Sequence, residues 1–388
     1  MKILMLRKTI VAIILGASSY WLTIHLIAPI FPIYLVDLGA SKAEVGFIVA
    51  IPSILSIFLR IPVASRVHSI GRFKFLGIAL IISSISLIAY GLARVIPDIY
   101  IARIIHSISI ASFGPVALAS ISVLSNDEER AKIMSIYLTA VAVAMILGPI
   151  LAGMLVALLN IPLTFTISGF MLIPISIMLI SLGRYDKPYC SIKNGSNFSL
   201  RKGLKLLVSK WAYMLLCIAT LSYSLTLGFF RAFFPIYAKE VYLLTASFVS
   251  FLYAVRACSN AVVRPILGAL CRKIGSRIIM ISGLLLVASS YYIFSLNLPL
   301  YAIIIAMALF GLGWAFYAVA SIIYIGYAIE SEYQDIAMAL YFNIYDIGSV
   351  VGSTLGGIIL YYLSYNMIWL TLSTLLVIGS LVLLAMHK

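Results

Sequence analysis

The chain has 388 residues, of which 63% are hydrophobic and only 10% are charged. Soluble domains carry nearer a quarter of charged residues, so this composition excludes a soluble enzyme or binding module of this length. The net charge of +15 would suit a nucleic-acid partner, but the distribution of the charges along the chain indicates a membrane topology instead.

Long apolar runs follow one another along the chain and predict twelve transmembrane helices, because about 20 apolar residues cross a bilayer core as a helix. The predicted spans are about 9–35, 43–65, 74–93, 98–123, 132–157, 161–183, 211–238, 243–270, 277–296, 299–325, 336–362 and 366–386. The first run is too long for a cleaved signal peptide and is predicted as a helix. The fold class expected is an all-α membrane protein.

The longest polar stretch divides the spans six and six. It predicts an N-terminal six-helix bundle at 1–183, a cytoplasmic central linker at 184–210 and a C-terminal six-helix bundle at 211–388. The linker holds two glycosylation sequons, which a cytoplasmic location would leave unused.

The two halves resemble each other. A shift of 204 residues aligns Gly148 with Gly352, and the tetrapeptide FPIY at 31–34 recurs at 234–237, 203 positions on. We expect FPIY to close the first helix of each half. Two parallel six-helix repeats are typical of transporters that bind substrate near the membrane midplane, where the repeats meet.

The basic residues are distributed unevenly between the two sides of the membrane. With the N-terminus in the cytoplasm, the inner segments hold 21 of the 27 Lys and Arg residues. This asymmetry follows the positive-inside rule and predicts a multi-pass cell-membrane protein with both termini cytoplasmic. The basic excess then reports contact with anionic lipid headgroups, and no nucleic-acid partner is expected.

Ionisable residues far from both membrane surfaces are few, and they are the candidate site residues: His25, Arg103, His106, Arg231, Arg256 and Asp346. Placing an arginine near the centre of a membrane helix costs about 2.5–3.5 kcal/mol, so each needs compensation. These residues would have a purely structural role if an arginine paired with Asp346 or with backbone carbonyls, or if a neutral histidine bonded to a serine. One acid cannot neutralise three arginines, which leaves at least two for a substrate.

Aromatic residues accompany these charges. Trp314 and Tyr317 share a stripe on the tenth span, and Trp21 shares a helix face with His25. Such stripes serve either packing or a substrate surface. Asp346 is the predicted proton carrier, with the two histidines as alternatives because histidine titrates near neutral pH. Asp346 is predicted at a similar depth in the membrane to Arg256, so we expect Asp346 and Arg256 to pair when no substrate is bound.

A basic loop follows the second predicted span. This loop, ASRVHSIGRFK, is similar to the motif G-x-x-x-D-R-x-G-R-[RK] through Gly71, Arg72 and Lys74, with His68 at the aspartate position. It resembles the gate motif of the major facilitator superfamily, and the resemblance to that family extends across the whole chain. A second copy, GALCRKIGSR, keeps Gly275 and has Arg272 at the acid position.

Two further segments carry the same resemblance. AMILGPILAG is similar to the antiporter motif through Gly148, Pro149 and Gly153, and Arg103 stands at the arginine of R-x-x-Q-G. The glycines are interpreted first as helix-packing positions, which small residues favour in lipid.

The resemblance implies two pseudo-symmetric bundles that work by alternating access, with the first, fourth, seventh and tenth helices lining a central cavity. It also implies a cytoplasmic gate anchored by the motif's aspartate. Since His68 cannot carry that negative charge, we expect a weaker or pH-dependent gate, and His68→Asp should favour the outward-facing state.

The sequence therefore predicts a secondary transporter, monomeric and without a cofactor, that moves a small organic molecule by proton-coupled efflux or exchange. No nucleotide-binding G-x-x-x-x-G-K-[ST] loop, H-E-x-x-H or C-x-x-C motif is present. The alternatives are an uptake permease for an organic anion or metabolite and, more remotely, a membrane-embedded transferase acting on a lipid-linked substrate or a receptor that transports nothing. The short outer loops disfavour the transferase.

Overall fold

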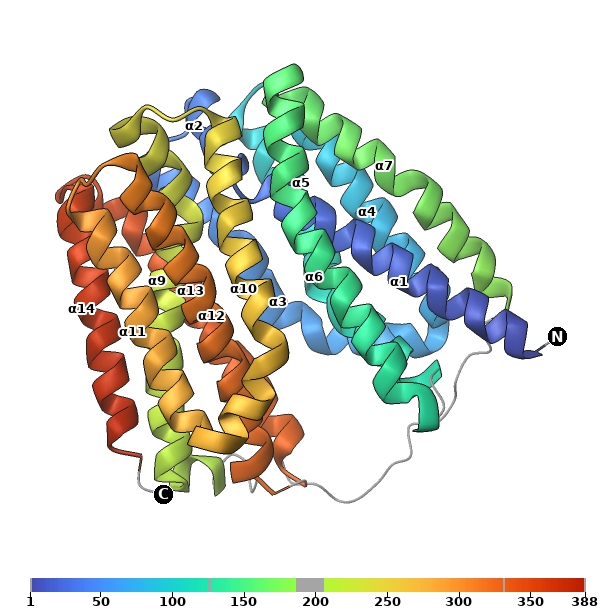
Figure 1. The fold of residues 1–388 in the computed structure, drawn as a ribbon. Helices are drawn as coiled ribbons and strands as arrows, with labels where there is room; N and C mark the ends of the chain where they lie inside the picture. The colour runs from blue at the N-terminus through green and yellow to red at the C-terminus, as the bar shows by residue number, and fades with distance from the viewer. Residues whose placement is uncertain (1, 125–126, 186–205, 331, 387–388) are drawn as a thin grey trace. The chain divides into compact units, whose positions relative to one another are not determined.

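The structure, a computed structural model, describes residues 2–124, 127–185, 206–330 and 332–386, and these contain helices and no strand. The α-helices labelled in Figure 1 are α1 (Lys2–Ile27), α2 (Phe31–Asp37), α3 (Lys42–Ile70), α4 (Arg72–Leu92), α5 (Ile96–Leu124), α6 (Asp127–Leu158), α7 (Ile161–Leu182), α9 (Trp211–Tyr242), α10 (Ala246–Ile274), α11 (Ser276–Ser295), α12 (Leu300–Ala328), α13 (Gln334–Ile359) and α14 (Tyr365–Leu384). Among the described residues, 12 helices are long and apolar enough to cross a membrane, which confirms the predicted number. A helix suits this environment because it satisfies its own backbone hydrogen bonds without water.

The first span differs from its prediction as one helix over 9–35. The structure ends α1 at Ile27, and α2 starts at Phe31 after a short turn. Pro29 lies in that turn, and a proline has no N–H to continue a helix. The second FPIY copy has Ala232 at the matching position and lies within the unbroken α9. The prediction that FPIY closes the first helix is therefore wrong for the first copy, which begins α2.

The two FPIY copies nevertheless make the same contacts. The Tyr34 hydroxyl donates to the backbone carbonyl of Tyr90 over 2.9 Å, and the Tyr237 hydroxyl donates to that of Phe294 over 2.6 Å. The ring centres of Phe31 and Tyr90 lie 5.0 Å apart, and those of Phe234 and Phe294 also lie 5.0 Å apart. Tyr90 and Phe294 are themselves 204 positions apart. The tetrapeptide recurs because it fastens the first spanning segment of each half to α4 or α11.

The chain divides into two compact units. Unit 1 comprises Met1–Ser41, Ile48–Ile192 and Leu244–Phe251, and unit 2 comprises Lys42–Phe47, Lys193–Leu243 and Leu252–Lys388. The first residues of α3 thus belong to unit 2, and those of α10 to unit 1. The predicted domain limits remain a prediction, and most of the predicted linker at 184–210 lies outside the described residues.

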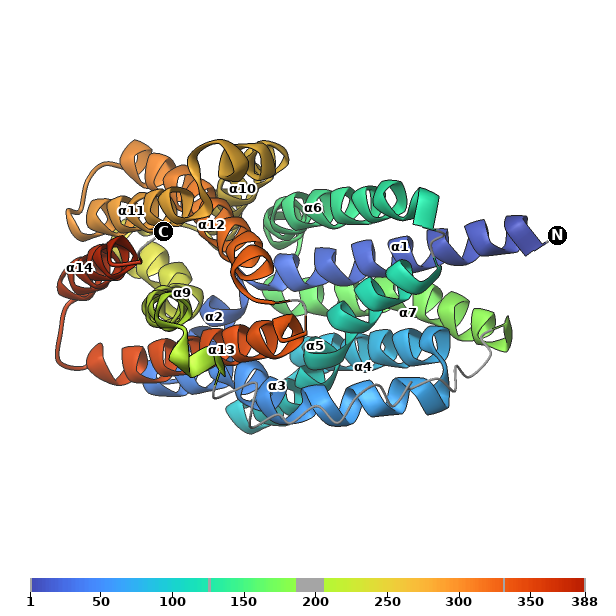
Figure 2. The same cartoon turned by 90° about the horizontal axis from the view of Figure 1, so that it is seen from below.

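Both units pair their helices in the same way. In unit 1, α1 packs on α6, while α4 packs on α5 and α7; in unit 2, α9 packs on α13, while α11 packs on α12 and α14. In Figure 2, α9 is seen nearly end-on and lies beside α13 and α14. The prediction of two pseudo-symmetric six-helix bundles is confirmed.

Glycines allow the closest of these pairings. A Cβ added at Gly148 in α6 would lie 2.6 Å from the Leu22 carbonyl oxygen of α1, and one at Gly352 in α13 would lie 1.8 Å from that of Leu225 in α9. The two glycines are 204 positions apart and the two leucines 203. Small residues let helix backbones approach in lipid, where no hydrophobic force drives helices together.

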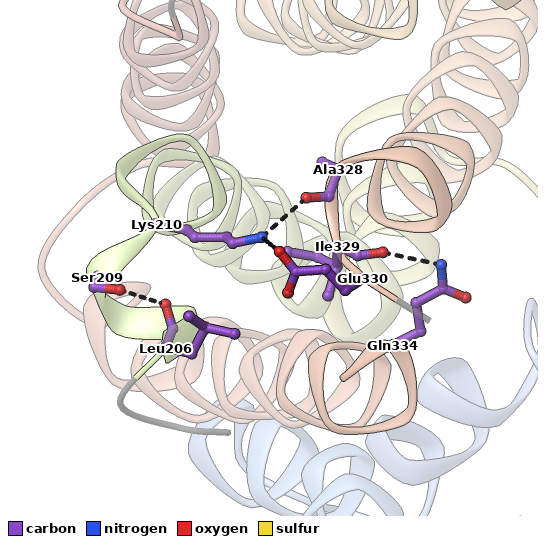
Figure 3. Close-up of polar contacts among 7 residues, drawn as sticks. All are labelled: Leu206, Ser209, Lys210, Ala328, Ile329, Glu330 and Gln334. Carbon is purple, nitrogen blue, oxygen red and sulfur yellow. Dashed lines mark hydrogen bonds and ion pairs between the residues drawn. The ribbon is translucent and has the colours of Figure 1, made fainter. Parts of the chain in front are cut away.

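Polar contacts fix the start of α9 within unit 2 (Figure 3). The Lys210 ammonium lies 2.8 Å from Glu330 Oε1 and donates to the Ala328 carbonyl over 3.4 Å. Gln334 Nε2 donates to the Ile329 carbonyl over 3.0 Å. The segment that enters α9 is therefore tied to the connection between α12 and α13.

Candidate functional site

A buried arginine on α10 lies among aromatic rings of unit 2. Arg256 is 6% exposed, and its guanidinium carbon lies 4.7 Å from the Tyr253 ring centre, 5.2 Å from Trp314, 5.4 Å from Phe230 and 5.5 Å from Phe310. The rings come from α9, α10 and α12. We call these four rings the aromatic box.

The box holds a charge that has no polar partner. Within the described part of the chain, Arg256 Nε has no hydrogen-bond partner, and no ion pair is formed by this guanidinium. Cation–π contacts contribute about 0.5–2 kcal/mol each. A buried charge without a counter-charge costs about 3–5 kcal/mol, so a ligand's negative charge would be strongly favoured here.

Close helix packing places the arginine. A Cβ added at Gly311 of α12 would lie 2.2 Å from the Arg256 carbonyl oxygen, so only glycine lets the two backbones come this close. Asn260 Nδ2 donates to the Gly311 carbonyl over 3.1 Å and fixes the same crossing. These contacts bring Trp314, one helical turn further along α12, against the face of α10 that carries Arg256.

A second arginine, which the sequence analysis did not single out, lies on the same helix. The Arg264 guanidinium carbon lies 6.0 Å from the Trp314 ring centre, and its Nε is also buried without a hydrogen-bond partner among the described residues. Arg264 is one of the 21 basic residues that the sequence predicts on the inner side of the membrane. Its spacing of eight residues from Arg256, which places it about 80° further around the helix and within one broad stripe, is the signal that would have identified it.

The predicted proton carrier does not pair with the arginine expected. Asp346 is 8% exposed and directly follows Tyr345 in α13. Arg231 Nη2 donates to the Tyr345 hydroxyl over 3.2 Å. No ion pair joins Arg256 to Asp346, both of which are described, so the structure lacks the pairing that the sequence predicted.

The predicted aromatic stripe on α12 divides into two roles. Trp314 is half-buried between the two arginines of α10. Tyr317 is fully buried, and its hydroxyl shares a 2.8 Å hydrogen bond with Thr220 Oγ1 of α9. Its ring lies 4.7 Å from that of Tyr223. Tyr317 therefore joins α9 to α12, while Trp314 belongs to the aromatic box.

The buried arginine of unit 1 has a polar partner. Arg103 is 9% exposed, its guanidinium carbon lies 4.6 Å from the Phe31 ring centre, and its Nε donates to the Ile48 carbonyl over 3.2 Å. Pro52 follows Ile48 by one helical turn in α3 and has no N–H to donate to that carbonyl. Arg103 thus supplies the hydrogen bond that the proline leaves unmade.

The histidines of unit 1 are placed differently from each other. His106 is fully buried, with Nε2 3.1 Å from the Ser83 hydroxyl and Nδ1 3.2 Å from the Tyr90 hydroxyl. Both ring nitrogens therefore contact neutral groups. His25 is half-buried, and its ring centre lies 6.0 Å from that of Trp21. A Cβ at Gly148 would lie 3.0 Å from His25 Cβ, so α6 packs against this face of α1.

The gate-motif residues lie at helix boundaries. Gly71 and Gly275 have φ of 88° and 91°, a conformation that favours glycine, and each directly precedes a helix, α4 or α11. Arg72 is half-buried, while Lys74 and Arg272 are exposed. The His68 side chain lies outside the described part of the structure, so the expectation of a weakened gate remains a prediction.

The antiporter-motif residues lie within α6. Pro149 is inside that helix, next to Gly148. A Cβ added at Gly153 would lie 3.1 Å from the Ser247 carbonyl oxygen, which belongs to the same unit. The described residues contain no group of three or more His, Cys, Asp or Glu side chains that could hold a metal ion.

Comparisons with known proteins agree on one family. The family model described as Major Facilitator Superfamily matches residues 13–242 and 216–387. An uncharacterised MFS-type transporter of Methanocaldococcus jannaschii is 23% identical over 353 residues, 90% of each chain. Multidrug resistance protein 1 of Bacillus subtilis (strain 168) is 24% identical over 264 residues, 67% of each chain.

Solved structures share the fold. A variant of the nucleoside transporter NupG superposes with a TM-score of 0.80 at 13% identity, covering 98% of this chain and 100% of that one. A bacterial homologue of the human lysosomal transporter Spinster, inward-facing and unoccupied, gives 0.75 at 16% identity, covering 98% and 94%. These relatives are transporters and not enzymes. Since the family model covers nearly the whole chain, the protein belongs to the Major Facilitator Superfamily of membrane transporters.

Proposed function

We propose that the protein is a secondary transporter that exports or exchanges a small organic anion across the cell membrane by alternating access, coupled to protons. The observation that carries the proposal is Arg256, a buried guanidinium enclosed by four aromatic rings and without a polar partner among the described residues. A ligand's negative charge would supply the missing counter-charge.

The chemistry of the box favours an organic anion over an inorganic one. A guanidinium has a planar fork of N–H donors that carboxylate and phosphate oxygens can bind in pairs. The rings offer apolar contact to the body of the ligand. The charge balance agrees, because among the described residues Arg231, Arg256 and Arg264 outnumber Asp346, the one carboxylate that is buried there.

Proton coupling is proposed to run through Asp346. Positive charge nearby favours the ionised carboxylate, and a bound anion offsets that charge. Substrate binding in the aromatic box would then favour proton uptake by Asp346, and substrate release would favour proton loss. The Arg231–Tyr345 contact lies next to Asp346 in the chain and would transmit the effect.

A second candidate substrate class is neutral amphipathic compounds. Its support is the similarity to multidrug resistance protein 1 together with the aromatic surface around Trp314. An uptake direction remains the alternative to efflux, and similarity to the nucleoside transporter extends to the fold alone.

Transport in proteoliposomes tests the proposal. Purified protein is assayed with a panel of organic carboxylates and their neutral amides, with and without an imposed proton gradient. We expect faster transport of the carboxylates and accumulation only with the gradient. Asp346→Asn should abolish accumulation and leave counterflow exchange intact. Equal transport of acids and amides would overturn the anion assignment, and accumulation by Asp346→Asn would move coupling to His25 or His106.

We also propose a monomer in the cell membrane with both termini in the cytoplasm. The excess of Lys and Arg in the segments on one side supports this orientation. Cysteine-accessibility labelling tests it: a cysteine at Lys42 or Lys239 should react with an impermeant reagent from outside, and one at Lys193 should not. Labelling of position 193 from outside would contradict the topology.

A further inference from the structure

Arg264 shares Trp314 with Arg256. The two guanidinium carbons lie 5.2 Å (Arg256) and 6.0 Å (Arg264) from the same ring centre, so they are no more than about 11 Å apart. On the helix axis, eight residues correspond to a rise of about 12 Å. The two cations therefore lie close to the same ring within unit 2.

Neither cation has a polar partner in the described structure. The Nε atoms of Arg256 and Arg264 are both buried and lack a hydrogen-bond partner. Two like charges this close in a poorly solvated region repel each other, and a single small anion at Arg256 would leave Arg264 uncompensated. By contrast, Arg272 and Lys273, at the end of the same helix, are exposed to solvent.

We propose that Arg264 forms a second anion subsite, and that the ligand of unit 2 carries two anionic groups, carboxylates or phosphates, joined by a body that packs on Trp314. This inference rests on the proposed function, in which Arg256 binds an anion. One group would bind Arg256 inside the aromatic box, and the other would bind Arg264. The size of the body is limited by the separation of the two guanidinium groups.

Matched acids and monoesters separate the two subsites. Purified full-length protein in nanodiscs is titrated calorimetrically with suberate, terephthalate and naphthalene-2,6-dicarboxylate, and with the monomethyl ester of each. We expect at least one diacid to bind ten or more times more tightly than its monoester. Arg264→Gln should remove this difference and leave the affinity for the monoester unchanged, which also shows that the variant is folded. Arg256→Gln should weaken binding of both.

The control variant Lys273→Gln removes an exposed cation from the same helix and should change neither affinity. The second subsite is overturned if no diacid binds more tightly than its monoester, or if Arg264→Gln lowers both affinities equally. Arg264→Gln that leaves the diacid affinity intact, while Arg256→Gln weakens the monoester, would overturn the second subsite and keep the proposed function. If Arg256→Gln, shown by its thermal melt to be folded, weakens neither ligand, the proposed function itself fails.

Discussion

Arg103 in unit 1 and Arg256 in unit 2 are alike in burial and different in what surrounds them. They are 9% and 6% exposed, and both lie against aromatic rings. Arg103 donates to the Ile48 carbonyl, which Pro52 leaves without its helical donor. Arg256 lies against several rings, and Arg256 Nε has no hydrogen-bond partner among the described residues. The first arginine completes the hydrogen bonding of a helix, and the second is the one that we propose binds a ligand.

The internal repeat explains where this difference arises. A shift of 204 residues places Pro52 of α3 at the position of Arg256 in α10, and Arg103 of α5 at that of Met307 in α12. Repeated positions, such as Tyr34 and Tyr237, make repeated packing contacts. The buried arginines fall at positions where the halves have diverged. The helix packing is repeated in both halves, while the candidate site lies in one half only.

The largest expected effect is on ligand binding when Arg256 is neutralised. Hydrogen bonds to charged groups contribute about 1.5–3 kcal/mol, so Arg256→Gln should weaken binding of organic carboxylates about 10- to 150-fold. The thermal midpoint should stay the same or rise, because an unpaired buried charge is removed. Calorimetric titration with a monocarboxylate and a melting curve measure the two quantities. If Arg256→Gln binds the carboxylate with unchanged affinity, the aromatic box has only a structural role.

Arg103 should show the opposite pattern. Arg103→Leu leaves the Ile48 carbonyl without a donor and should destabilise the fold by about 1–3 kcal/mol, with little change in ligand affinity for the protein that remains folded. The double variant Arg103→Leu/Pro52→Ala restores a helical N–H at the right place, so it should recover much of the stability. Thermal melting of the two variants beside wild type measures this. Lost binding without lost stability would instead place Arg103 in the site.

The sequence predicted the number and order of the helices well, because each helix is marked by a local run of apolar residues. Runs of apolar residues mark each span, and the fixed offset between Gly148 and Gly352 reveals the repeat before any contact is known. The break after Ile27 was missed because the run around Pro29 stays apolar, and hydropathy does not register a missing backbone donor.

The candidate site was only partly predictable, because its character depends on which helices meet. Arg103 and Arg256 look equivalent in the sequence, and only the contact between α3 and α5 shows that one of them is satisfied. Arg264 lies near the end of a predicted span, and its contact with Trp314 depends on how α10 packs against α12, which the sequence does not show. The sequence does not show that the Ser83 and Tyr90 hydroxyls lie on the two ring nitrogens of His106, because these contacts join α4 to α5.

A smaller effect is expected from the ring shared by the two arginines of α10. Trp314→Leu removes a cation–π partner, worth about 0.5–2 kcal/mol, and should weaken binding of an aromatic carboxylate about 2- to 30-fold. It keeps an apolar side chain in place, so stability should change little. Comparing an aromatic with an aliphatic carboxylate by calorimetry isolates stacking on the ring. An equal loss for both ligands would indicate a displaced Arg256 instead of a lost stacking surface.

The smallest effect concerns Tyr317, which shares the helical stripe of Trp314 yet lies wholly covered. Its hydroxyl is paired with Thr220 Oγ1 at 2.8 Å, so Tyr317→Phe removes one buried hydrogen bond and leaves the ring packed. A neutral hydrogen bond contributes about 0.5–1.5 kcal/mol, and the fold should lose about that much stability. Thr220→Val should cost somewhat more, because it also removes the 2.8 Å bond from Thr220 Oγ1 to the Leu216 carbonyl, and the double variant should cost little more than Thr220→Val alone. Denaturation curves in detergent measure the cycle, and transport should be unaffected. A transport defect in Tyr317→Phe with stability unchanged would return Tyr317 to the substrate surface and extend the site along α12.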